Sequence, residues 1–174
     1  MERTQEILSV LMFGSDAADA EKKVVEAINR VAADVGRIER VSQSYRSRAY
    51  GFSSEREFVN RTAAVTTRLT AEELLDAVNA IEAQMGRDRE AERRQQQRTG
   101  ERYTSRPIDI DIVFYGDESR STDRLTIPYH FLSEREYALR PLAEVAGDYR
   151  HPQIGRTPRE MLAELTGAQK TEIR

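Results

Sequence analysis

The sequence predicts an α+β protein with a ferredoxin-like βαββαβ core and a helical C-terminal extension. Four stretches of strand length carry apolar residues that either alternate with polar ones or run together. Two stretches with helical spacing of apolar residues separate the first strand from the second and the third from the fourth. Further helical patterns follow the fourth strand, and the length of 174 residues suits a single domain spanning 1–174.

The first half of the core is expected to contain three strands and one helix. Ile7–Phe13 is a near-continuous apolar run that ends at glycine, which is typical of a central buried strand. Ser15 or Asp16 is expected to cap a helix over Ala17–Val35, whose apolar residues keep helical spacing. The second and third strands are predicted over Ile38–Tyr45 and Phe58–Leu69.

The second half is expected to add a helix, the last strand of the core and the extension. Thr70 and Glu73 form a capping-box pattern, and the helix that they open carries an apolar stripe as far as Met85. Residues 87–105 hold six arginines without apolar periodicity, so they form either a functional or disordered loop or, as the composition favours, an extension of this helix. The remaining predictions are the strand around Ile108–Ile112, a turn over Asp117–Asp123, an edge segment over Arg124–Pro128, and helices over Glu134–Val145 and from Thr157.

Composition excludes several classes of function. The chain has no cysteine, so disulfides and thiolate metal sites are excluded. Its net charge of −3 gives no global basicity that would favour nucleic acid. The first apolar run is too short for a signal peptide or a membrane span. We therefore expect a soluble, cytoplasmic protein without nucleic-acid or membrane partners. Separately from composition, we expect it to be a monomer.

Asp109 and Asp111 are the first candidate site. In a strand they stand on one face, roughly 7 Å apart at the backbone, while Ile108, Ile110 and Ile112 point into a core. Two carboxylates so close repel each other unless a cation lies between them, and oxygen ligands in small number suit Mg²⁺. The alternative is an amphipathic strand whose two carboxylates are simply solvated.

The arginines that precede this strand suggest chemistry on phosphates. Cations held by carboxylates can bridge phosphate oxygens, and guanidinium groups can take the remaining charge. The segment Gly14-Ser15-Asp16 lacks the glycine spacing and lysine of a Walker A loop, and His130 and His151 alone do not make a Ser-His-Asp triad credible. Phosphoryl-type transfer with two metal ions is the chemistry that remains.

Three segments together resemble one enzyme family. Gly100–Gly116, which contains Arg-Pro-Ile-Asp-Ile-Asp-Ile, Arg124–Pro128 and Arg135–Ala146 are similar to the 6-hydroxymethyl-7,8-dihydropterin pyrophosphokinases of folate biosynthesis. The resemblance runs from the first strand to about Thr166. It implies transfer of pyrophosphate from ATP to 6-hydroxymethyl-7,8-dihydropterin, with AMP released and two Mg²⁺ ions as cofactors.

The resemblance also implies roles for individual residues. The catalytic set would be Arg87, Arg106, Asp109 and Asp111, of which the two aspartates would hold Mg²⁺. Contacts with ATP would come from Asn79, Glu82, Arg89, the Ile112 backbone, Arg124, Thr126, Tyr129 and Arg135. Contacts with the pterin would come from Ser47, Arg48, Tyr50, Phe58, Asn60 and Tyr137. Such an arrangement is physically reasonable, because a flat heterocycle can stack between two aromatic rings while an amide side chain forms hydrogen bonds with the polar groups at its edge. Without the resemblance, core packing of the aromatic residues and a turn or edge position for the asparagine are favoured.

The chain departs from the family pattern around the expected site. Asp16 stands where the family usually has asparagine, and Ala49 where it commonly has proline. Tyr129 holds the place of a family histidine and is followed by His130, while Glu90–Gly100 looks longer than the family's third loop. The alternative is therefore a catalytically impaired paralogue that binds nucleotide or pterin in a regulatory or interaction role. A module that binds RNA or protein on its sheet is disfavoured, because an aromatic sheet face and global basicity are both missing.

Overall fold

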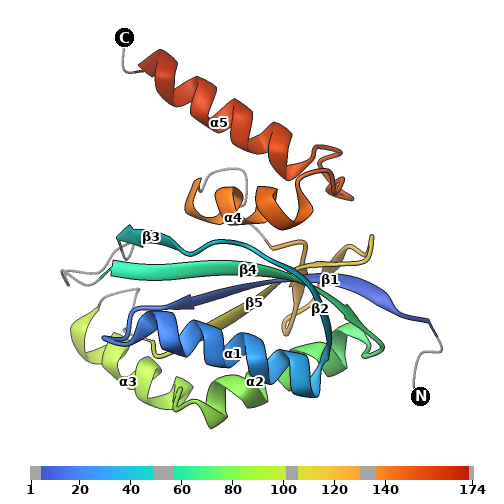
Figure 1. Ribbon diagram of the computed structural model, residues 1–174. Helices are drawn as coiled ribbons and strands as arrows, with labels where there is room; N and C mark the ends of the chain where they lie inside the picture. Colours follow the sequence, from blue (N-terminus) through green and yellow to red (C-terminus); the bar gives the residue numbers. More distant parts are fainter. Residues whose placement is uncertain (1–4, 49–56, 101–105, 130–135, 173–174) are drawn as a thin grey trace.

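The computed structural model describes residues 5–48, 57–100, 106–129 and 136–172. The strands are β1 (Ile7–Ser15), β2 (Gly36–Val41), β3 (Tyr45–Arg48), β4 (Glu57–Thr67), β5 (Asp109–Tyr115), β6 (Arg120–Ser121) and β7 (Thr126–Ile127). The helices are α1 (Ala20–Asp34), α2 (Ala71–Gln84), α3 (Arg89–Thr99), α4 (Glu136–Ala146) and α5 (Pro158–Glu172). Figure 1 shows α1 and α2 on one face of the main sheet, and α4 on the other face with α5 outside it.

The main sheet has the predicted ferredoxin-like order. Its strands follow one another as β2-β4-β1-β5, and all neighbours pair antiparallel. Strand β3 also pairs antiparallel with β4, nearer to the start of β4 than the residues that pair with β2. The second predicted strand is divided into β2 and β3. At the break the Ser42 amide still donates to the Thr62 carbonyl at 2.8 Å, but the Thr62 amide donates to the Ser42 hydroxyl at 2.9 Å, and the Ser42 carbonyl accepts from Arg61 Nε at 3.0 Å. Strands β6 and β7 pair separately, within the segment predicted as a turn and an edge.

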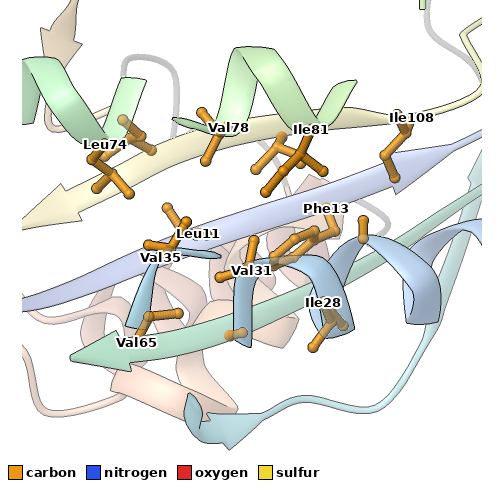
Figure 2. Close-up of a cluster of buried hydrophobic side chains, with 14 of the residues drawn as sticks. Leu11, Phe13, Ile28, Val31, Val35, Val65, Leu74, Val78, Ile81 and Ile108 are labelled. Carbon is orange, nitrogen blue, oxygen red and sulfur yellow. The ribbon is translucent and has the colours of Figure 1, made fainter. Parts of the chain in front are cut away.

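The larger hydrophobic core lies between the sheet and helices α1 and α2. Leu11 and Phe13 of β1 meet Val31 of α1 and Ile81 of α2, as Figure 2 shows. The three isoleucines of the Asp-x-Asp segment, Ile108, Ile110 and Ile112, are buried in the same cluster, as predicted. Because side chains alternate along a strand, the two aspartates between them belong to the opposite face.

A second hydrophobic cluster covers the opposite face of the sheet. Met12 of β1 and Phe114 of β5 pack there against Leu139 and Leu142 of α4, and Met161 of α5 joins them. The pairing of β1 with β5 shifts register between Val10 and Leu11, so that Val113 and Phe114 both join this cluster. The second cluster fixes α4 above the strands that carry the candidate site.

The helix starts were predicted with mixed success. The capping box at α2 is confirmed: the Thr70 hydroxyl accepts from the Glu73 amide at 3.2 Å, and the Glu73 carboxylate accepts from the Thr70 amide at 3.1 Å. The expected cap of α1 by Ser15 or Asp16 is wrong. The N-cap is Asp19, without a side-chain cap bond, while the Ser15 hydroxyl accepts from the Ala17 amide in the preceding turn.

The arginine-rich segment forms a helix of its own, so the prediction that it extends the second helix is wrong. Gly86 has a φ of +96°, a left-handed conformation that ends the helical path after α2. Asp88 then caps α3 by accepting from the amides of Glu90 and Ala91, each at 3.1 Å. Within the described ranges, no helix is long and apolar enough to cross a membrane.

Candidate active site

The two candidate metal ligands lie on β5 beside the end of β1. Asp109 pairs with Gly14 and Asp111 pairs with Met12 across the antiparallel ladder, and both aspartates are half-buried. Since β5 is the last strand of the sheet order, its outer edge is open to groups from α2 and α3. The site therefore combines a sheet face with a sheet edge.

Glu82 closes the outer edge of β5. Its side chain, at the end of α2, is only 1% exposed, and Oε2 accepts from the backbone amide of Ile110 at 2.9 Å. The same oxygen accepts from Arg87 Nη1 at 2.6 Å, and Oε1 accepts from Arg89 Nη2 at 2.7 Å. One carboxylate thus satisfies an amide of the edge strand and binds two of the predicted arginines.

Arg87 lies in a cage of three carboxylates. Its Nη1 donates to Asp109 Oδ1 at 2.9 Å as well as to Glu82. Its Nε and Nη2 donate to the two oxygens of Glu92 at 3.0 and 3.4 Å, and the Arg87 side chain is 3% exposed. Arg106 Nη1 reaches the other oxygen of Asp109 at 3.3 Å. All four residues of the predicted catalytic set therefore lie together, because Asp111 is two residues from Asp109 on the same face of β5.

The surroundings of Asp111 disfavour its charged form. Burial raises the pKa of the Asp111 carboxyl well above its ordinary value, and the carboxylates of Asp109 and Glu82 raise it further, while Arg106 and Arg87 act in the opposite direction. Burial also raises the pKa of Glu82, against the lowering effect of Arg87. Burial lowers the pKa of the Arg87 guanidinium, but Asp109 and Glu82 outweigh it and raise this pKa overall.

This donor set suits Mg²⁺. The ion binds through one or two carboxylates and completes its shell with water or phosphate oxygens, and a cation there would relieve the repulsion at Asp111. Among the described residues, no group of three or more His, Cys, Asp or Glu side chains is arranged to hold a metal ion. A site of two carboxylates that relies on substrate oxygens therefore fits better than a complete protein cage.

Three of the predicted pterin residues share the sheet face beside β1. Ser47 of β3 pairs with Phe58 of β4, and Asn60 Nδ2 donates to the Ser47 hydroxyl at 3.3 Å. Asn60 is 2% exposed and pairs with Gly14. An added Cβ at Gly14 would lie 2.3 Å from Phe58 Cε1, so glycine is what allows the ring to lie over the end of β1. Tyr137, in the first turn of α4, packs against the second hydrophobic cluster.

The residues predicted to contact the nucleotide are spread along α2 and the neighbouring strands. Arg89 Nη2 donates to Asn79 Oδ1 at 3.4 Å. Farther toward the start of α2, Arg124 donates to Asp76 Oδ1 at 2.6 Å and to Glu72 Oε2 at 3.4 Å. The other three predicted nucleotide contacts within the described residues lie on the strand side: Ile112 has its side chain in the core, Thr126 is exposed in β7, and the Tyr129 amide donates to the Val113 carbonyl at 3.0 Å.

Several positions singled out in the sequence lie outside the described residues. Tyr50 and Arg135 lie outside the described residues, and so do Ala49 and His130, two of the positions where the chain departs from the family pattern. Arg48 ends β3, and only its backbone belongs to the described part.

Sequence reasoning missed two contributors to the site. Glu92 holds one edge of Arg87, and a helix start at Asp88 was the signal that would have placed it in a first turn. Asp16 was considered only as a helix cap and as a departure from the family pattern, not as a contributor to the site. It is 2% exposed, and its Oδ1 accepts from the Arg106 amide at 2.9 Å.

The chain is similar to known proteins over most of its length. The 7,8-dihydro-6-hydroxymethylpterin-pyrophosphokinase (HPPK) family profile matches residues 10–147. A 2-amino-4-hydroxy-6-hydroxymethyldihydropteridine pyrophosphokinase of Methylorubrum extorquens is 35% identical, over 93% of this chain and 97% of its own length. The protein of the same name from Pseudomonas aeruginosa is 33% identical over 87% of each chain.

Solved structures share the fold. The HPPK-DHPS of Plasmodium falciparum, crystallised with pteroate, matches 99% of this chain with a TM-score of 0.76 at 14% identity. The chain spans 45% of the length of that protein. The sequence matches, which cover most of the chain, show that it belongs to the 7,8-dihydro-6-hydroxymethylpterin-pyrophosphokinase family.

Proposed function

We propose that this chain transfers pyrophosphate from ATP to 6-hydroxymethyl-7,8-dihydropterin and releases AMP. The observation that carries the proposal is the cluster on β5, in which Asp109 accepts from both Arg87 and Arg106 and has Asp111 beside it. Carboxylates for cations and guanidinium groups for phosphates are the two components that such a transfer needs. Membership in the HPPK family supports the same reaction.

In this reaction the hydroxymethyl oxygen of the pterin attacks the β-phosphorus of ATP. A new O–P bond forms, the bond from that phosphorus to the oxygen shared with the α-phosphate breaks, and AMP leaves with this oxygen; the hydroxyl proton is lost to solvent. Asp109 and Asp111 would hold two Mg²⁺ ions. Bound there, the ions would neutralise phosphate charge and orient the phosphates for in-line attack.

The arginines would stabilise charge on the transferred group. Arg87 Nη1 now donates to Asp109, so a cation at Asp109 would free this donor for a phosphate oxygen, while Glu82 continues to hold the same nitrogen. Arg106, which donates to the other Asp109 oxygen, would be freed in the same way. Burial of this cluster strengthens each of these interactions, since water screens them less.

The pterin would bind on the sheet face beside Gly14. Its ring would stack between Phe58 and Tyr137, and Asn60, held by the Ser47 hydroxyl, would read its edge. The nucleotide would extend along α2, where Asn79, Arg89 and Arg124 lie. The remaining proposed contacts are Glu82, the Ile112 backbone, Thr126, Tyr129 and Arg135 for ATP, and Arg48 and Tyr50 for the pterin.

The test combines binding and turnover in one preparation. A non-hydrolysable ATP analogue is titrated calorimetrically with and without Mg²⁺, then the pterin is titrated, and AMP formation is measured with ATP and pterin. We expect Mg²⁺-dependent AMP formation at about 1 s⁻¹ or faster. Binding of both ligands without AMP would overturn the proposal in favour of a catalytically impaired paralogue. Analytical ultracentrifugation of the same sample tests our further proposal that the chain acts as a single-domain monomer.

A further inference from the structure

Glu92 is a carboxylate at the site to which the family resemblance gives no role. It lies in the first turn of α3, and it binds Arg87 from the side opposite to Asp109. We infer that Glu92 is a positioning residue for pyrophosphoryl transfer, because it fixes the orientation in which Arg87 meets the phosphates. The inference rests on the proposed function and adds a residue to it.

The contact has the geometry of a two-point clamp. Arg87 Nε donates to Glu92 Oε1 at 3.0 Å and Nη2 donates to Glu92 Oε2 at 3.4 Å, so both carboxylate oxygens engage one edge of the guanidinium. A bidentate pair fixes the plane of the guanidinium, which a single contact does not. The Arg87 side chain is 3% exposed and the Glu92 side chain 15% exposed, so water screens the ion pair only weakly.

The clamp leaves the other end of the guanidinium for the reaction. Nη1 points to Glu82 and Asp109, which lie on α2 and β5. If a cation takes Asp109, two of the three carboxylates around Arg87 remain, and Glu92 is the one that engages two nitrogens. An arginine side chain otherwise has many rotamers, and ordering it in advance lowers the entropic cost of meeting the transition state.

The position of Glu92 follows from how α3 begins. Asp88 caps the helix, which places Glu92 in a first turn where the helix dipole stabilises a negative charge. No described side chain of α3 belongs to the buried core, so the helix depends on polar contacts such as Arg87–Glu92 and Arg89–Glu82 to stay against the body. An ion pair that only anchors α3 would affect stability, whereas a positioning residue affects the rate through Arg87.

A double-mutant cycle separates these two roles. We would measure kcat and the KM for ATP in Glu92→Ala, Arg87→Ala and the double variant, with Glu90→Ala as the control, because Glu90 is an exposed glutamate in the same turn. We expect kcat to fall roughly tenfold to a hundredfold in Glu92→Ala, with a smaller change in KM, and to stay unchanged in the control. The double variant should be no slower than Arg87→Ala alone, because Glu92 then has nothing to position.

Three results would contradict the assignment. Additive losses in the double variant would mean that Glu92 does not act through Arg87. An unchanged kcat in Glu92→Ala, with AMP formed normally by the wild-type chain, would overturn this inference and leave the proposed function intact. Absence of AMP formation by the wild-type chain would overturn the proposed function and this inference with it. If circular dichroism shows Glu92→Ala unfolded, Glu92→Gln takes its place in the cycle, because it keeps one acceptor oxygen and the size of the side chain.

Discussion

Asp16 and Arg106 are joined by two hydrogen bonds, although 90 positions separate them in the sequence. The Arg106 amide donates to Asp16 Oδ1 at 2.9 Å, and the Asp16 amide donates to the Arg106 carbonyl at 3.3 Å. The turn after β1 is thereby fixed against the segment that leads into β5 and its aspartates. The family usually has asparagine where Asp16 stands, and an asparagine Oδ1 offers the same acceptor.

Replacing Asp16 should distinguish its hydrogen bond from its charge. Asp16→Asn keeps the acceptor, so we expect stability and kcat close to wild type. Asp16→Ala leaves the Arg106 amide without this acceptor, which should cost about 1–3 kcal/mol in urea unfolding and lower kcat by displacing Arg106. Asp19→Ala is the control, since Asp19 makes no side-chain cap bond. Equal losses in the asparagine and alanine variants would show that the charge, not the acceptor, matters.

Replacing Asp111 by asparagine should raise stability and lower activity. Partial burial and the neighbouring carboxylates of Asp109 and Glu82 disfavour the charged form of the half-buried Asp111, so Asp111→Asn is expected to raise the free energy of unfolding of the Mg²⁺-free protein. The same variant should lower kcat at least about a hundredfold, because it weakens the proposed metal site. Asp109→Asn should lower kcat similarly, and Asp123→Asn, at an exposed position, should change neither quantity. Normal turnover in both site variants would refute the metal assignment.

Gly14→Ala should affect the pterin more than the nucleotide. The new Cβ would lie 2.3 Å from Phe58 Cε1 and 3.1 Å from Asn60 Oδ1, so the ring must move. We expect calorimetry to show pterin affinity weakened by roughly tenfold or more, with affinity for the ATP analogue nearly unchanged. At Gly167 an added Cβ meets no atom within 4 Å, which makes Gly167→Ala the matched control. Unchanged pterin binding in Gly14→Ala would argue against a pterin site on this face.

Glu82 should be the most costly carboxylate to remove. Glu82→Ala leaves the buried Ile110 amide without its acceptor and takes one of three carboxylates from Arg87. Breaking a buried pair of this kind costs roughly 3–5 kcal/mol. The exposed pair Arg30–Glu26 offers a contrast, since Glu26→Ala should cost less than about 1 kcal/mol. Denaturant midpoints of the two variants measure the difference, and similar midpoints would contradict a structural role for Glu82.

His151 should make the protein less stable in mild acid. Burial lowers the pKa of His151, whose Nδ1 accepts from the amides of Gln153 and Ile154, each at 3.1 Å. The unfolded chain takes up this proton near an ordinary pKa of about 6.5, so stability is full above that pH, falls as the pH drops from there to the lower folded pKa, and then levels off. His151→Asn, whose Oδ1 can still accept, should flatten the dependence of unfolding free energy on pH between 7 and 5. An unchanged slope would exclude His151 as its source.

The sequence predicted those parts of the molecule that depend on neighbours along the chain. Alternation from Ile108 to Ile112 placed the isoleucines in the core, and the capping box at Thr70 fixed the start of α2. The order of strands and helices predicted the sheet topology, because short connections leave few ways to arrange βαββαβ. The same alternation singled out Asp109 and Asp111 as a candidate metal site. The resemblance in three segments supplied the pterin residues Phe58, Asn60 and Tyr137, which periodicity alone had left as ordinary core and edge positions.

Tertiary structure decided which polar groups of distant segments meet. That β5 lies at the edge of the sheet, where Glu82 can accept from its backbone, depends on the whole strand order rather than on any local pattern. The separate helix α3 and the clamp of Glu92 on Arg87 depend on one left-handed glycine and one capping aspartate within a uniformly polar segment. Local patterns record which face of an element is apolar, but a polar side chain finds its partner only when packing of the core brings the two segments together.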